Sequence, residues 1–221
     1  MKRRECIIFD MDGVLVLSEA AMKAASIQVL KEYGVDAGPE DFLEFTGMGE
    51  DMFIGGVARK YGADYHPAMK DAAYSVYAER AAEEVLVFPG VREGLARLKV
   101  GGYRLCVASA ADLVKVNINL KCIGCNADFF DAVVTGSDIT NKKPDPEVFL
   151  KAAELAETEP ADCIVVEDAL AGIAAARAAG MRSIGVATAF DSVALYAAGA
   201  DHVVARFLEV YPTIKDWTDA G

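Results

Sequence analysis

Histidine, cysteine and positive charge are all scarce in this chain of 221 residues. It has 2 histidines, 5 cysteines, and 22 Lys and Arg residues against 34 Asp and Glu residues, which gives a formal net charge of -12. Binding to a nucleic-acid backbone relies on clustered Lys and Arg, so this balance argues against nucleic acid as a partner. An acidic protein that handles anions must gather positive charge locally, from a metal ion, a lysine or helix N-termini.

Long apolar runs are also missing. No run approaches the roughly 18 residues that a membrane span needs, which argues against a membrane partner. The apolar stretch at residues 6–9 follows a basic N-terminus, but Asp10 and Asp12 break it at once, so it does not form the core of a signal peptide. We expect a cytoplasmic location, because an odd number of cysteines suits a reducing compartment better than a disulfide framework.

Cys122 and Cys125 form a C-x-x-C pair, a spacing that also occurs in zinc sites and redox motifs. Zinc would need more ligands, and His66 and His202 lie far away in the sequence. The spacing therefore favours a structural role for these two thiols, and the sequence assigns them no function.

Short apolar runs rich in β-branched residues predict buried strands. They lie at residues 6–9, 104–108, 132–134, 163–166, 183–186 and 202–204. Helical patterns lie between them, at residues 91–99, 146–156 and 171–179. This alternation predicts an α/β fold, a Rossmann-like parallel sheet core with helices on both faces.

The stretch between residues 18 and 84 breaks the rhythm, since it shows helical periodicity and no convincing strand. It predicts four helices, at residues 21–33, 41–45, 51–61 and 68–85. Ligands of open α/β sheets bind at the carboxyl ends of the strands, so an insert after the first strand is expected to form a cap there. We expect linkers near residues 14–17 and 85–90. They would separate a catalytic core (residues 1–16 and 86–221) from an inserted four-helix cap domain (residues 17–85).

Two acidic pairs directly follow predicted strands. Asp10 and Asp12 follow the first strand, and Glu167 and Asp168 follow the strand that begins near residue 163. Carboxylates at the ends of buried strands are costly without a metal ion or a shared proton. Together, Asp10, Glu167 and Asp168 would form an oxygen cluster suited to Mg²⁺.

A hydroxyl and a lysine add possible phosphate ligands. Ser109 ends a predicted strand just before a helix, where its hydroxyl and backbone amides such as that of Ala110 make an anion site. Lys143 precedes Pro144 and a helix, so it can present its ammonium to a phosphate. Each signal is weak alone, because serine is a common helix cap and lysines are mostly solvated.

The order of these motifs resembles the haloacid dehalogenase superfamily over essentially the whole chain. The family's four motifs are matched by D-x-D-G-V-L from Asp10, by Ser109, by Lys143 with its proline, and by Glu167 with Asp168. The helical insert resembles the cap of the β-phosphoglucomutase-like branch. Three stretches are also similar to the phosphatase-like domain of plant chloroplast quenching-suppressor proteins, at residues 45–58, 108–120 and 165–172.

The resemblance implies a phosphatase that acts on a small phosphorylated metabolite, such as a sugar phosphate. Asp10 would attack phosphorus and become an aspartyl-phosphate. Asp12 would protonate the leaving oxygen and then accept a proton from the hydrolytic water. Ser109 and Lys143 would hold the transferring phosphate, with the amide of Ala110 beside them.

The resemblance also implies Mg²⁺ as the cofactor. The ion would be held by the side chain of Asp10, the backbone carbonyl of Asp12 and the side chain of Asp168. Glu167 would lie nearby or behind these ligands. This ion would also supply part of the local positive charge that an acidic chain needs.

A β-phosphoglucomutase-type isomerase is the main alternative, and it must grip a second phosphate. No Lys or Arg occurs between residues 42 and 58, and Ala111 and Asp112 stand where the mutase carries a polar and basic pair. A second phosphate would face Glu50 and Asp112, which repel it. The sequence therefore favours a simple phosphatase over the mutase.

Candidates for substrate specificity lie in the insert: Ser18, Met22, Gly47, Met48 and Glu50. Ser18 either touches substrate or caps the first helix of the insert. Met22 and Met48 either line an apolar pocket or pack inside the insert.

Two further readings are disfavoured. A halide-removing hydrolase needs neither an acid at Asp12 nor Mg²⁺, and a catalytically retired binding module would have lost a motif residue, whereas none is lost. The natural substrate and the oligomeric state cannot be read from the sequence.

Overall fold

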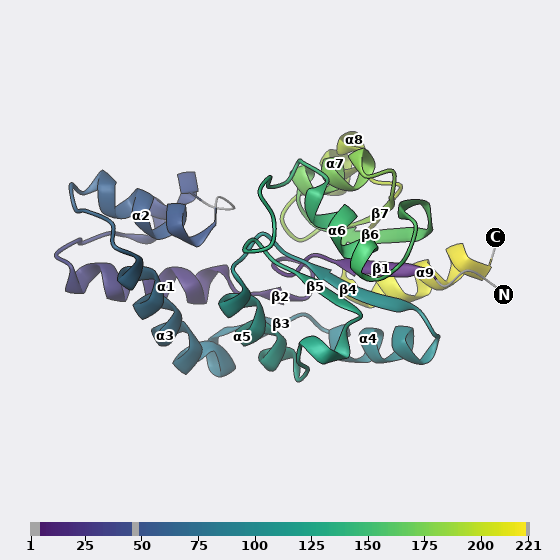
Figure 1. Cartoon of the computed structure of the whole chain (residues 1–221), viewed down its shortest axis with the longest axis horizontal. Helices are drawn as coiled ribbons and strands as arrows, with labels where there is room; N and C mark the ends of the chain where they lie inside the picture. The colour runs from purple at the N-terminus through teal and green to yellow at the C-terminus, as the bar shows by residue number, and fades with distance from the viewer. Residues whose placement is uncertain (1–4, 46–48, 220–221) are drawn as a thin grey trace.

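The computed structural model describes residues 5–45 and 49–219. Six strands form one parallel sheet in the order β5-β4-β1-β6-β7-β8 (Figure 1). Their bounds are β1 Cys6–Phe9, β4 Arg104–Ala108, β5 Ala132–Val134, β6 Cys163–Glu167, β7 Arg182–Val186 and β8 His202–Val204. The α/β fold and the six predicted strands are therefore confirmed, and β1 lies inside the sheet between β4 and β6.

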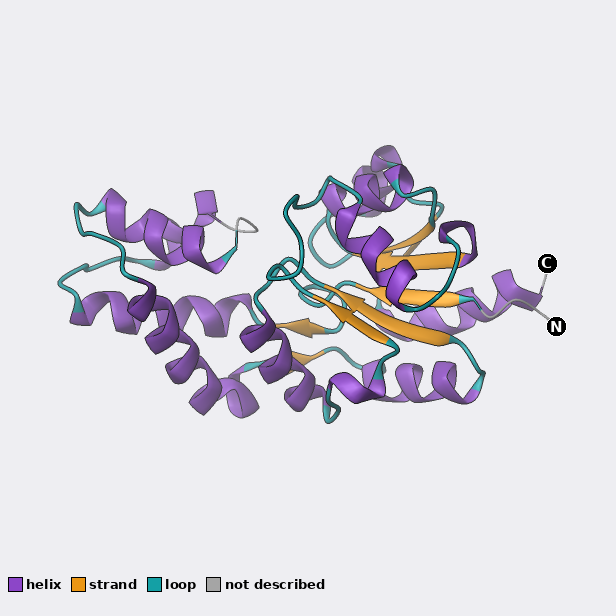
Figure 2. Ribbon diagram, in the orientation of Figure 1, coloured by secondary structure: helices purple, strands orange, loops and turns teal. Residues whose placement is uncertain are grey.

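Helices cover both faces of this sheet (Figure 2). They are α4 (Val91–Val100), α5 (Leu113–Ile123), α6 (Glu147–Leu155), α7 (Leu170–Ala178), α8 (Ser192–Ala198) and α9 (Val210–Asp219). Successive strand residues point to opposite faces. Ile7 and Phe9 pack into one apolar cluster with α4, α5 and α9, whereas Cys6 and Ile8 pack into another with α6 and α7.

The insert extends away from the sheet, at the left of Figure 1, and consists of helices as predicted. Its elements are α1 (Glu19–Glu32), η1 (Pro39–Phe45), α2 (Glu50–Lys60) and α3 (Pro67–Glu84). The helix predicted at residues 41–45 is part of η1, which is a 3₁₀ helix and not an α-helix. This segment is too short to gain much from α-helical hydrogen bonds, and 3₁₀ geometry is common in such short pieces.

A two-stranded antiparallel ribbon, which the sequence did not predict, lies where the chain enters and leaves the insert. It pairs β2 (Val16–Leu17) with β3 (Leu86–Val87). Two residues are too few to show the alternation by which a strand is recognised. The ribbon falls within the two predicted linkers.

Two smaller expectations concern the cysteines and the membrane. Cys122 and Cys125 are partly buried free thiols that pack against the larger apolar cluster. Within residues 5–45 and 49–219, no helix combines the length and the apolar character needed to cross a membrane.

Candidate active site

Four sequence motifs meet at the carboxyl edge of the sheet. Asp10 follows β1, Ser109 follows β4 and Asp168 follows β6, and β1 lies between β4 and β6. Parallel strands end at the same edge, so the topology brings these side chains together. Lys143 joins them from the loop before α6. All four residues line a cavity of about 450 Å³.

Lys143 is the cation at the centre of this group. Its Nζ donates to Oδ1 of Asp10 at 2.5 Å, to Oε1 of Glu167 at 2.8 Å and to the carbonyl oxygen of Ala108 at 3.3 Å. Its ammonium also lies 4.8 Å from the centre of the Phe149 ring. These contacts hold the buried lysine beside the carboxylate of Asp10.

Asp10, Glu167 and Asp168 form the predicted acidic cluster. Each offers one carboxylate oxygen, and these oxygens lie within 4.8 Å of one another. Glu167 Oε2 accepts hydrogen bonds from the backbone N–H groups of Asp168 at 2.6 Å and Ala169 at 2.9 Å. Protein donors therefore engage both oxygens of Glu167, which suits an orienting role better than direct ligation.

The cluster holds more negative charge than its surroundings neutralise. Burial, together with the charges of Glu167 and Asp10, raises the pKa of Asp168 to about 9. Burial likewise raises the pKa of Asp10 to about 7, although the Lys143 ammonium opposes this shift. A hard divalent cation with oxygen ligands would compensate this charge, so the residues present fit Mg²⁺.

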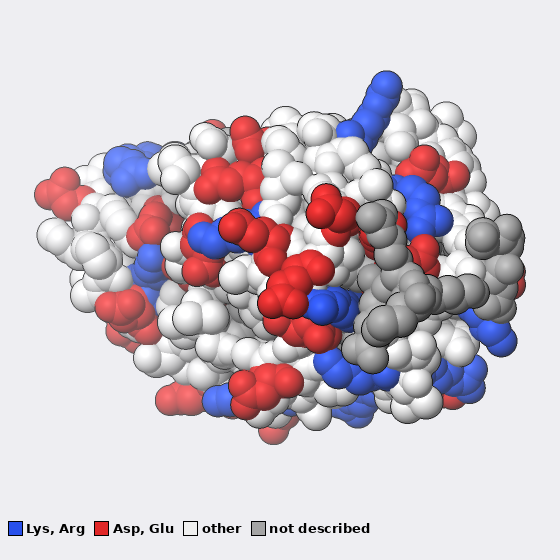
Figure 3. Space-filling model, turned by 45° about the vertical axis from the view of Figure 1, so that its right-hand side comes forward, with Lys and Arg blue, Asp and Glu red and all other residues white. Residues whose placement is uncertain are grey.

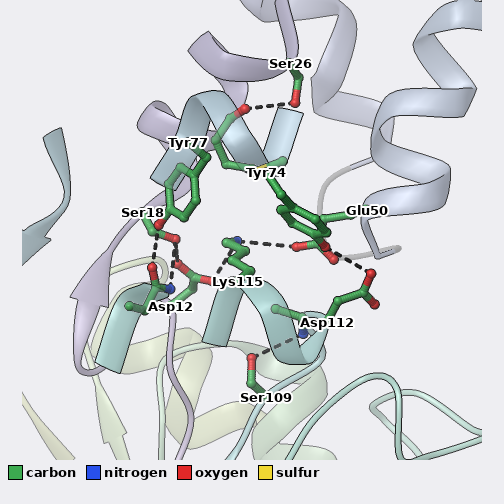
Figure 4. Close-up of polar contacts among 12 residues, drawn as sticks. Asp12, Ser18, Ser26, Glu50, Tyr74, Tyr77, Ser109, Asp112 and Lys115 are labelled. Carbon is green, nitrogen blue, oxygen red and sulfur yellow. Dashed lines mark hydrogen bonds and ion pairs between the residues drawn. The ribbon is translucent and has the colours of Figure 1, made fainter. Parts of the chain in front are cut away.

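Asp12 does not share this cluster, because its carboxylate contacts other residues. Ser18 Oγ donates a hydrogen bond to Oδ1 of Asp12, and Lys115 Nζ donates to Oδ2 at 3.0 Å (Figure 4). The Asn119 side-chain amide donates to Ser18 Oγ at 3.4 Å, and the Tyr77 hydroxyl donates to the Asn119 carbonyl oxygen. A chain of buried polar groups thus fixes the orientation of Asp12.

Ser109 and Ala110 lie where the sequence predicted them, in the cavity wall. Ser109 is buried, and its Oγ accepts a hydrogen bond from the backbone N–H of Ala111 at 3.2 Å. The hydroxyl proton of Ser109 therefore stays available to a bound anion.

Lys115 is a component of the site that sequence reasoning missed. It lies in the first turn of α5 and is only 8% exposed. Burial opposes the charged form, but the carboxylates of Asp12 and Glu50 outweigh that effect and raise the pKa of Lys115. The sequence held one sign of this role. Lys115 stands between Val114 and Val116, shortly after the strand that ends at Ala108.

The residues predicted to set substrate specificity do not all line the cavity. Ser18 is buried against Asp12, whereas Met22 and Glu50 line the cavity. Gly47 and Met48 lie outside the described residues.

The structure corrects the expectation that Asp112 faces a second phosphate. Asp112 Oδ2 accepts from Lys70 Nζ at 2.9 Å and from the Tyr74 hydroxyl at 3.0 Å. The described cavity wall does not include Asp112, because α3 of the insert supplies it with partners. A further lysine, Lys142, does line the cavity, although it was not among the predicted site residues.

The sequence profile of the haloacid dehalogenase-like hydrolases matches residues 7–186. The chain belongs to this family. Over 197 residues, this hydrolase is 41% identical to Protein SUPPRESSOR OF QUENCHING 1, chloroplastic, of Arabidopsis thaliana, a match that covers 87% of the hydrolase and 19% of the plant protein. It is 34% identical to a phosphoglycolate phosphatase of Nitrosospira multiformis, over 80% of each chain. It also spans 59% of a bifunctional riboflavin kinase/FMN phosphatase of Arabidopsis thaliana, at 23% identity.

Solved structures agree with this assignment. A mutant of CbbY from Rhodobacter sphaeroides, in complex with xylulose-(1,5)bisphosphate, has a TM-score of 0.82 at 28% identity, covering 93% of this hydrolase and 96% of CbbY. A β-phosphoglucomutase from Clostridium difficile has a TM-score of 0.79 and covers 98% of each chain, but its identity of 24% supports the fold alone. The predicted family and the α/β fold are confirmed.

Proposed function

We propose that this hydrolase is a Mg²⁺-dependent phosphatase that cleaves a small phosphomonoester through an aspartyl-phosphate on Asp10. The contact between Asp10 and Lys143, set beside two further carboxylates, carries the proposal. Such a site combines a nucleophile, a fixed cation and a metal-binding cluster, which are the components that phosphoryl transfer requires. The phosphoglycolate phosphatase among its relatives supports a small phosphorylated substrate.

In the first step, a carboxylate oxygen of Asp10 forms a bond to phosphorus while the bond between phosphorus and the leaving oxygen breaks. Asp12 gives its proton to that leaving oxygen, so the product departs as a neutral alcohol. In the second step, water attacks phosphorus, Asp12 accepts its proton, and phosphate leaves Asp10.

The remaining residues bind and orient the phosphate. Lys143 would exchange part of its contact with Asp10 for phosphate oxygens, and Ser109 and the Ala110 amide would donate hydrogen bonds to them. Asp10, the backbone carbonyl of Asp12, and Asp168 would hold Mg²⁺, with Glu167 orienting the group. When bound, Mg²⁺ supplies positive charge that offsets the negative charge of the phosphate and the nucleophile.

We also propose that residues 17–85 act as a cap domain over a core of residues 1–16 and 86–221. Residues from both parts line the cavity, and the β2–β3 ribbon lies where the linkers were predicted. Opening and closing at these linkers would admit substrate and exclude water. A cytoplasmic location remains the proposal that fits five free thiols.

The test is phosphate release from a panel of phosphorylated metabolites with Mg²⁺, comparing wild type with Asp10→Asn. Asp64→Asn is a matched control, since Asp64 is exposed in the insert. We expect Asp10→Asn to lower turnover on the order of 10³-fold or more, and a chelator to abolish it. Turnover that survives in Asp10→Asn would exclude the aspartyl-phosphate mechanism.

A further inference from the structure

Acidic side chains outnumber basic ones in the wall of the cavity. Six carboxylate side chains and three ammonium groups stand among the described residues that line it. The carboxylates are those of Asp10, Asp12, Glu19, Glu50, Glu167 and Asp168, and the cations are Lys115, Lys142 and Lys143. A divalent metal ion and one substrate phosphate would offset each other's charge, so the cavity would remain unfavourable for a second anion.

Among the described residues, Glu50 has the one fully buried side-chain oxygen without a hydrogen-bond partner. It begins α2 and is only 6% exposed, so water reaches it poorly. Its Oε1 lies 3.6 Å from Lys115 Nζ, whereas its Oε2 is fully buried and has no hydrogen-bond partner among the described residues. Buried polar atoms in proteins are nearly always satisfied, so an exception at a cavity wall points to a missing partner.

Glu50 lies on the side of the cavity where the alcohol part of the substrate, the leaving group, would bind. Lys115 lies between the two carboxylates, 3.0 Å from Oδ2 of Asp12 and 3.6 Å from Oε1 of Glu50 (Figure 4). Asp12 is the group that protonates the leaving oxygen in the proposed mechanism. The part of the substrate beyond that oxygen therefore lies near Glu50.

The protein hydroxyl beside Glu50 in Figure 4, that of Tyr74, is already engaged, because it donates to Asp112. Met22 and Phe53 line the same part of the insert with apolar surface. A metal ion at Glu50 is disfavoured because the Lys115 ammonium, which lies between the carboxylates of Glu50 and Asp12, would repel it. A hydroxyl or ammonium group, in contrast, would satisfy Oε2 once the Glu50 carboxylate turns toward the cavity.

We propose that Glu50 Oε2 accepts a hydrogen bond from the alcohol part of the substrate, so that the enzyme selects phosphomonoesters whose alcohol carries a hydroxyl or ammonium donor and no second anion. The inference rests on the proposed phosphatase function and names its substrate class. Polyol, sugar and amino-alcohol monophosphates belong to this class. Sugar bisphosphates and phosphorylated carboxylic acids do not.

The test compares kcat/KM for four substrates of similar size. Glycerol 3-phosphate and O-phosphoethanolamine carry a donor, propyl phosphate carries none, and 2-phosphoglycolate carries a carboxylate. We expect wild type to prefer each donor-bearing substrate over propyl phosphate by about tenfold or more, since a buried charged acceptor that loses its donor is strongly disfavoured. The two donor-bearing substrates show whether a hydroxyl or an ammonium group is the better partner.

Glu50→Gln tests the assignment to this residue. The amide oxygen of Gln would turn to the Lys115 ammonium, which leaves its NH₂ group facing the cavity. The ratio of kcat/KM for glycerol 3-phosphate to that for 2-phosphoglycolate should then fall by about tenfold or more. Glu79→Gln, an exposed change in α3, is the matched control and should keep the wild-type ratio. Thermal unfolding of both variants verifies that they fold.

Three outcomes would overturn the inference. Equal use of propyl phosphate and both donor-bearing substrates by wild type contradicts it, and so does a Glu50→Gln ratio equal to that of Glu79→Gln. In both cases phosphate release that still depends on Asp10 would leave the proposed function standing. Absence of Asp10-dependent release from all four substrates and from the wider metabolite panel would overturn the function and the inference together.

Discussion

At the scale of single residues, the site is governed by a shortage of positive charge. Within the part of the chain that the structure describes, Lys143 is the one ammonium in contact with the cluster of Asp10, Glu167 and Asp168. Burial raises the pKa values of Asp10 and Asp168, and the neighbouring carboxylate charges, which one cation cannot neutralise, add to the rise. Metal binding and protonation therefore compete for the same oxygens.

The first prediction concerns Asp168 and pH. Burial and the charges of Glu167 and Asp10 raise the pKa of Asp168 to about 9, against about 3.9 in an unfolded chain. The folded state thus holds this proton more tightly, so the contribution to stability is complete below about pH 4 and is lost as pH rises toward 9. Without metal, the wild-type Tm should fall between pH 6 and pH 9, and Asp168→Asn should show a smaller fall.

The same Tm measurements repeated with Mg²⁺ test whether Asp168 binds the metal ion. Added Mg²⁺ should raise the wild-type Tm most at high pH, where protons no longer occupy the cluster, and should raise that of Asp168→Asn much less. Asp64→Asn should behave as wild type does. An Asp168→Asn protein that matched the wild-type Tm at each pH, with and without Mg²⁺, would contradict the proposed role of Asp168.

At the scale of elements, helix α7 packs so closely on the side chain of Glu167, at the end of strand β6, that a residue larger than glycine at position 172 would displace it. A Cβ atom added at Gly172, in the first turn of α7, would lie 1.7 Å from Oε1 of Glu167. Lys143 bonds to that same oxygen. The helix therefore helps to position Glu167, and through it the lysine.

Gly172→Ala should disturb the site although it improves the helix. Alanine is favoured over glycine inside helices by about 1 kcal/mol, so a loss of function cannot come from helix propensity. The displaced Glu167 should lower Mg²⁺ affinity and kcat/KM by about tenfold or more, measured by Mg²⁺ titration of phosphate release.

Gly38→Ala is the control for this substitution, since a Cβ there would make only ordinary contacts, the nearest at 3.7 Å. A Gly172→Ala enzyme with the wild-type Mg²⁺ dependence would show that Glu167 can move without consequence, and would remove Glu167 from the proposed metal site.

At the scale of the whole molecule, charge limits which substrates can enter. The net charge is -12, and acidic side chains gather over the middle of the face drawn in Figure 3. Residues of the insert and of the core line the cavity together, and six carboxylates stand among its described lining residues. One phosphate would fit beside a metal ion, whereas a bisphosphate would meet uncompensated negative charge.

The chain should therefore act as a phosphatase and not as a β-phosphoglucomutase-type isomerase. With β-glucose 1-phosphate as substrate, adding glucose 1,6-bisphosphate should yield no glucose 6-phosphate, measured by coupling to glucose 6-phosphate dehydrogenase. A mutase assayed in parallel verifies the reagents. Bisphosphate-dependent formation of glucose 6-phosphate would establish the mutase and contradict the argument from charge.

The sequence by itself determined the central sheet and the residues that meet at its edge. Apolar runs predicted all six strands, and parallel strands end at one edge, so Asp10, Ser109, Glu167 and Asp168 were expected along that edge. Their close approach depends on the strand order, with β1 between β4 and β6, which the structure shows. Each motif is local, consisting of a strand followed directly by polar residues, and local patterns can be read along the chain.

Only the tertiary structure decided which partners surround those residues. Lys115 meets Asp12 across 103 positions of sequence, and Asp112 turns away from the cavity because Lys70 and Tyr74 of the insert bind it. No local pattern records such distant contacts, and a lysine in a helix is usually exposed. The unpaired oxygen of Glu50 likewise exists only after the insert has packed against the core, since burial and hydrogen bonding are properties of the packed chain.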